Sequence, residues 1–115
     1  MSYPKELKTG GKIMDAVNCT ADTNSDVVII ERGKIVSVDI IMDNNNYVGT
    51  AKYMVCNDLT PTNPNWNEVA NTAISSGVNV AELVDLVDLG AKYFKVFMDW
   101  TSGDGDTTIV VHVKN

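Results

Sequence analysis

The stretch YFKVFMDWT (residues 93–101), the polar segment SGDGD (102–106) and the stretch TTIVVHVK (107–114) decide the fold. Large apolar side chains occupy every second position of both stretches, which is the period of a strand with one buried face. The positions expected to face the core are Phe94, Val96, Met98, Trp100, Ile109, Val111 and Val113. Two alternating runs around a Gly-Asp-Gly segment predict a β-hairpin over residues 93–114.

Strand signals also recur upstream, where apolar runs are separated by turn residues. We expect strands at 13–20, 26–30, 35–42, 48–57 and 66–69, and a further one within 73–89. Helical spacing is the alternative for 73–89, but β-branched residues and flanking glycines favour a strand. The core face of the run 35–42 is expected to carry Val36, Val38, Ile40 and Met42, with Ser37 and Asp39 opposite. The pattern predicts an all-β fold, a single antiparallel β-sandwich or jelly-roll-like domain of about seven to nine strands.

The first twelve residues differ from the rest of the chain. They are basic and poor in apolar residues, so we expect an extended N-terminal arm over 1–12 and the β-sandwich domain over 13–115. The arm is interpreted as a strap that binds a neighbouring subunit, with a solvated tail as the alternative. The residues expected to bind the partner are Tyr3, Lys5, Leu7, Lys8 and Lys12.

Composition excludes several classes of protein. A net charge of −6 with a single arginine disfavours nucleic acid as a partner, because phosphate binding needs a basic face. No apolar run approaches the ~18 residues of a membrane-spanning helix, and the start lacks the apolar core of a secretory signal. The spacing of Cys19 and Cys56 fits no metal site. They are expected to be buried thiols, with a disulfide as the alternative.

The sequence contains no recognisable catalytic set, so we expect neither an enzyme nor a cofactor. The one histidine, His112, alternates with apolar neighbours on a predicted strand, which favours a structural role. Asp43, Asp104 and Asp106 are weak candidates for calcium, because clustered Asp and Asn oxygens suit that ion. The same residues are equally typical of tight turns.

Loop aromatics are the other candidate for function. Trp66 lies in a predicted loop and Tyr47 lies next to one, and both residue types stack on sugars in binding modules. They would form a planar glycan-binding patch, to which Phe97 could contribute. The alternative is that Trp66 covers the edge of the core.

Five segments follow one another in a characteristic order. They are IVSVDIIM (35–42), GTAKYMVCND (49–58), NWNEV (65–69), DLGAKYFKV (88–96) and TSGDG (101–105). This order resembles a family of small tailed-phage virion proteins with the layout strand, GTxKxxVSND, TNWxxV and GxRYxRVxYTxxSGTGTLxVxxxxK. The resemblance covers about residues 26–114. Departures are the longer stretch before Trp66, lysine at the two arginine positions (Lys92, Lys95), and Asp104 and Asp106 in the final loop.

The resemblance implies a structural bacteriophage protein, made in the host cytoplasm and located on the capsid exterior. The role that it favours is a capsid decoration protein, which binds the major capsid protein and stabilises the capsomers. Because many copies must assemble, a homodimer or homotrimer is expected. A tail or fibre-associated adaptor with the same fold is one alternative, and a carbohydrate-binding β-sandwich module is another.

Overall fold

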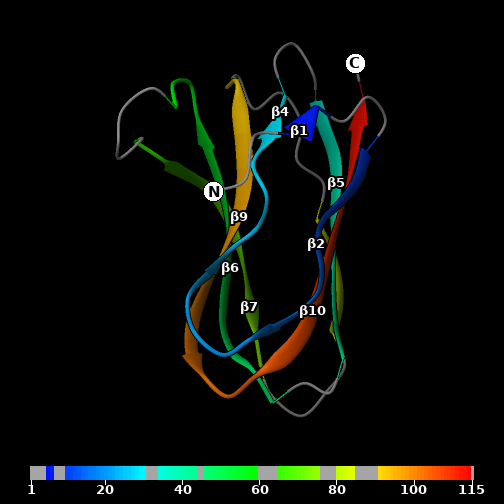
Figure 1. Cartoon of the computed structure of the whole chain (residues 1–115), viewed down its shortest axis with the longest axis vertical. Coiled ribbons are helices and arrows are strands. Elements are labelled where there is room, and N and C mark those ends of the chain that lie inside the picture. Colours follow the sequence, from blue (N-terminus) through cyan, green and yellow to red (C-terminus); the bar gives the residue numbers. More distant parts are fainter. Residues whose placement is uncertain are drawn as a thin grey trace.

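Two β-sheets packed face to face form the structure, a computed structural model (Figure 1). It describes residues 5–6, 10–30, 34–43, 46–59, 65–75, 80–84 and 91–114. Over these ranges the chain forms ten strands and no helix, which confirms the expected all-β sandwich.

The larger sheet has six strands. Its order is β1 (Lys5–Glu6), β4 (Val28–Ile29), β9 (Tyr93–Ser102), β6 (Val48–Cys56) and β7 (Asn67–Ile74), and β3 (Thr23–Asn24) pairs with β9 beside β4. Pairing is antiparallel except between β1 and β4, which run parallel.

The smaller sheet has four strands, and all of its pairs are antiparallel. Its order is β2 (Gly10–Cys19), β10 (Gly105–Lys114), β5 (Lys34–Asp43) and β8 (Val80–Val84). The expected strand within 73–89 therefore exists as β8, while 85–90 lies outside the described residues. The short strand expected at 66–69 is longer than predicted and continues to Ile74.

The predicted hairpin over 93–114 is wrong, although both of its strands exist. Strand β9 pairs within the six-stranded sheet and β10 within the four-stranded sheet, so the chain crosses between layers at Gly103 and Asp104. Gly103 has a φ of 73°, and a β-carbon there would overlap the backbone oxygen of Asn46. Alternation shows only that each strand has one buried face, and it does not identify the strand's hydrogen-bonding neighbour.

The core lies between the sheets and is built from their inward-facing side chains. Six of the seven core positions expected in the two deciding stretches are buried, as are Val38, Ile40 and Met42 of β5. At the start of β5 the prediction is wrong for Ser37, because the register with β10 shifts between His112 and Val113, while the side chain of Val36 lies outside the described residues. The shift buries Ile35 and also Ser37, which was expected on the solvent face.

Tyr47 and Trp100 have exchanged their expected environments. Tyr47 is fully buried, and its ring lies against Gly49, where a β-carbon would come within 2.8 Å of the ring. Trp100, the seventh predicted core residue, is 38% exposed at the end of β9. The register between β6 and β9 shifts beside it, between Val48 and Gly49. Tyr47 therefore closes the core at this end of the sandwich.

The expected arm is partly integrated into the sandwich. Lys5 and Glu6 pair in parallel with Val28 and Ile29 at the edge of the six-stranded sheet. Strand β2 already begins at Gly10, two residues before the expected boundary at 12.

Candidate functional site

Three segments far apart in the sequence meet where β9 begins. The side-chain oxygen of Asn57 accepts a hydrogen bond from the backbone N–H of Lys92 at 3.2 Å. The Lys95 ammonium lies 4.5 Å from the centroid of the Trp66 ring, and the Lys92 ammonium lies 5.5 Å from that of Tyr93. We call Trp66, Lys92, Tyr93 and Lys95 the cation–aromatic patch. All four are half-buried.

The local sequence explains why these residues converge. On β9 the core face carries Phe94, Val96 and Met98, so Tyr93 and Lys95 alternate onto the outer face of the sheet. Trp66 directly precedes β7 and lies over Lys95. Asn57 follows the end of β6 and connects it to the residue before β9.

Lys95 is the most unusual charge of the patch. Burial lowers the pKa of its ammonium below the ordinary value, and the neighbouring Cys56 offsets this only in part. Among the described residues, no carboxylate lies within ion-pair distance of Lys95. Its ammonium instead lies over the ring of Trp66, an interaction of about 0.5–1 kcal/mol at partly exposed sites. The patch therefore contains a partly dehydrated cation that pairs with none of the described carboxylates.

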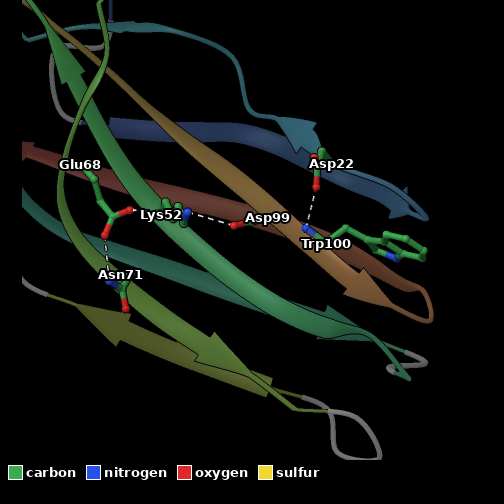
Figure 2. Close-up of polar contacts among 6 residues, drawn as sticks. All are labelled: Asp22, Lys52, Glu68, Asn71, Asp99 and Trp100. Carbon is green, nitrogen blue, oxygen red and sulfur yellow. Dashed lines mark hydrogen bonds and ion pairs between the residues drawn. The ribbon is translucent and has the colours of Figure 1, made fainter.

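A polar network crosses the outer face of the same sheet farther along β9 (Figure 2). The Lys52 ammonium lies 2.9 Å from a carboxylate oxygen of Asp99 and 3.8 Å from one of Glu68. The Asn71 amide donates to the other Glu68 oxygen at 2.9 Å. The hydrogen bond from Lys52 to Asp99 is the main reason that the pKa of Lys52 is raised. The charge of Lys52 is thus balanced within the sheet, unlike that of Lys95.

The opposite end of the sandwich is acidic. The Asn18 amide donates to Asp104 at 3.2 Å and to Asp106 at 2.9 Å. Asp43 is the register partner of Asp106. The Asp22 carboxylate accepts the backbone N–H of Trp100 at 2.8 Å (Figure 2). We call Asp22, Asp43, Asp104 and Asp106 the acidic end.

The structure thus brings the three candidate calcium residues to one end of the molecule. A neutral amide, that of Asn18, lies between two of their carboxylates. Within the described ranges, no group of three or more His, Cys, Asp or Glu side chains is arranged to hold a metal ion. Calcium binding at Asp43, Asp104 and Asp106 stays a prediction.

The two candidate glycan-binding aromatics differ in their exposure. Tyr47 has no exposed surface, so it offers no face on which a sugar could stack, and this expectation is wrong. Trp66 is half-buried, with the Lys95 ammonium over its ring. Phe97 is half-buried on the outer face, with Lys52 as its register partner.

The arm residues are only partly described. Tyr3, Leu7 and Lys8 lie outside the described residues, and Lys5 is described through its backbone in β1. Lys12 is exposed and forms an ion pair with Asp15 at 3.3 Å.

The remaining candidates from the sequence are the two cysteines and the histidine. Cys19 and Cys56 are both buried and are not joined to each other. His112 is exposed on β10, opposite Gly10 and Ser37 in the register.

Sequence reasoning missed Asn18, Asp22 and the partnership of Lys95 with Trp66. Asn18 and Asp22 form hydrogen bonds with residues about 80 positions away, and no local sequence pattern predicts such contacts. The only available signal for the Trp66 and Lys95 pair was that both belong to segments of the resemblance.

Comparisons with protein families, curated proteins and solved structures find no match. The described part of the chain includes no helix of the length and apolarity needed to cross a bilayer.

Proposed function

We propose that this chain is a structural virion protein of a tailed bacteriophage, namely a capsid decoration protein. It binds the major capsid protein on the outer shell, stabilises the capsomers and associates with copies of itself. No enzymatic step and no cofactor are part of this role.

One observation carries the proposal: segments of the resemblance contact each other in the fold. Asn57 is the penultimate residue of the segment GTAKYMVCND, Trp66 belongs to NWNEV, and Lys92 and Lys95 belong to DLGAKYFKV. Asn57 bonds to Lys92, and Lys95 lies over Trp66. Residues that recur together because they build one scaffold are expected to meet in this way. The two-sheet sandwich is also the fold that the resemblance implies.

The test is the number of copies of the protein on purified particles, measured by quantitative mass spectrometry against the major capsid protein. Hundreds of copies per particle are expected for a decoration protein, because shells present many equivalent sites. About six or twelve copies would instead identify a tail adaptor with the same fold. Absence from washed particles would refute both versions.

The arm has a separate test. Deleting residues 2–9 removes β1 but leaves β2, which begins at Gly10, intact. We expect this variant to fold and to occupy fewer sites on particles, because the arm extends the contact area. A matched control, Lys5→Ser with Lys8→Ser, keeps the arm's length and removes only charge. Full occupancy by the deletion variant would refute a binding role for the arm.

A carbohydrate-binding module is the second candidate, and the exposed part of Trp66 is the observation that favours it. The burial of Tyr47 removes the other expected stacking surface. Binding to a glycan array that Trp66→Ala abolishes would support this candidate. An array without hits would count against it.

A further inference from the structure

Four aspartates of different strands and connections gather at one end of the sandwich, the acidic end defined above. Strands β2, β5, β7 and β9 end, and strands β6, β8 and β10 begin, at the same end of the molecule, at the bottom of Figure 1. The register places them together, since Cys19 pairs with Gly105, Asp43 with Asp106 and Ile74 with Gly49. The segments that join these strand ends contain no lysine or arginine in the sequence, and their charged residues are Asp22 and Asp104. Asp43 is the last residue of β5 and Asp106 the second of β10, and the four aspartates together form the acidic end.

The other end carries several lysines together with the exposed Asp58, which follows the end of β6. Lys34 and Lys114 are register partners where β5 begins and β10 ends. Lys92 and Lys95 belong to the cation–aromatic patch, and each lies over an aromatic ring. No carboxylate among the described residues neutralises either of these two lysines.

The two ends are too far apart to neutralise each other within one molecule. Lys95 lies near the start of β9, and Asp104 follows the end of this strand at Ser102. At ~3.3 Å per residue, the seven steps from Lys95 to Ser102 correspond to about 23 Å. Electrostatic screening at physiological salt acts over about 8 Å. Each end therefore presents its own charge to a partner.

Each end also presents a tryptophan, a residue type enriched in the energetically dominant contacts of interfaces. Trp100 is 38% exposed at the acidic end. It is held in place because its backbone N–H bonds to Asp22 and its indole N–H bonds to the Gly103 carbonyl at 2.7 Å. Trp66 lies in the patch at the other end. The acidic end and the cation–aromatic patch are thus opposite in charge, and each carries a tryptophan.

We propose that the acidic end of one copy docks on the cation–aromatic patch of a second copy. The contact joins two different surfaces of the chain, so it is heterologous. Such contacts close into a ring or propagate as an open chain, and they do not form a two-fold dimer. Lys95 favours this contact because folding has already removed part of the water around its ammonium. Association therefore has a smaller desolvation penalty at this residue. The inference concerns the purified chain and does not require a virion.

The test is sedimentation velocity of the full chain at about 10–100 μM, in low and high salt. We expect wild-type assemblies in low salt and at least a tenfold weaker association in high salt. Two charge-reversal variants are then compared, Lys92→Glu with Lys95→Glu, and Asp104→Lys with Asp106→Lys. Each is expected to be monomeric alone. Their mixture should associate, because the first variant keeps its acidic end and the second keeps its patch.

A variant could be monomeric simply because it folds poorly. Association of the mixture excludes this explanation, because it requires both variants to be folded. Asp15→Lys with Asp39→Lys is the matched control, because it changes net charge as much as the second variant but at neither end. It should associate like the wild type. The proposal would be overturned by a wild type that is monomeric in low salt or whose association does not depend on salt. It would also be overturned by a mixture of folded variants that stays monomeric, or by a control variant that loses association.

Discussion

Gly49→Ala tests how tightly the core is closed at the end where Tyr47 is buried. A β-carbon at Gly49 would lie 2.8 Å from the Tyr47 ring and closer still to the backbone oxygen of Asp99. These separations are below the 3.0 Å that real β-carbons respect. The Asp99 carbonyl belongs to β9, which pairs directly with β6, so it cannot turn away as a flexible side chain would.

Two effects of opposite sign decide the outcome. Replacing glycine by alanine at an unstrained position stabilises a protein by about 0.4–1 kcal/mol, because the unfolded chain loses freedom. Overpacking a core costs about 1–3 kcal/mol. Since a backbone atom is the nearest obstacle, we take the upper part of that range. The net effect is a destabilisation of about 1–2 kcal/mol. With an unfolding entropy of ~2.1 cal/mol/K per residue, this lowers the melting temperature by about 4–8 °C.

Differential scanning calorimetry of Gly49→Ala and wild type measures this shift. Ala73→Ser is the matched control, because it also adds one heavy atom, but on the exposed face of β7. The control should stay within about 0.5 kcal/mol of wild type. A melting temperature of Gly49→Ala equal to or above that of wild type would refute the packing described for Tyr47 and Gly49.

Three further outcomes are expected. Burial raises the pKa of Tyr47 above its ordinary value of 10.0, so the folded state keeps a proton that the unfolded state loses, and stability falls as pH rises above 10. Tyr47→Phe should therefore lose less stability between pH 8 and pH 11 in urea titrations, and an equal loss would contradict this. Asp99→Asn removes the ion pair with Lys52, so it should lower the melting temperature at low ionic strength and much less in concentrated salt. Equal shifts of the melting temperature under both conditions would argue against a stabilising ion pair. Cys19 and Cys56 should react with iodoacetamide only on unfolding, because both are buried; rapid labelling of the native protein, read by mass spectrometry, would disprove this.

The fold class was predictable because apolar alternation is a local property. The alternation of residues 94–98 and 109–113 identified strands and their core faces correctly. What alternation lacks is information about neighbours, and the pair β9 and β10 illustrates this: a hairpin and a crossing between sheets bury the same side chains. The difference lies in contacts of Gly103 and Asp104 with Asn46, which is more than 50 positions away.

The errors within strands have the same origin. Period-two counting fails wherever a register shift inserts a residue, as it does at the start of β5 and beside Trp100. The exchange of Tyr47 and Trp100 followed from such a shift, together with the space that Gly49 leaves for a ring. For the candidate site, the sequence identified Trp66, Asp104 and Asp106 as notable, but not the tertiary contacts of Lys95 or Asn18.

The position of β10 has a consequence for biosynthesis. This strand comprises residues 105–114, and it lies between β2 and β5 as a central strand of its sheet. Within the described residues, β2 pairs with no other strand, so β2 has no partner until β10 has been synthesised. While the ribosome still holds those residues, the nascent chain carries unpaired strand edges that can aggregate. The four-stranded sheet therefore cannot be completed before β10 has left the ribosome, and chaperone binding before that point would protect these edges.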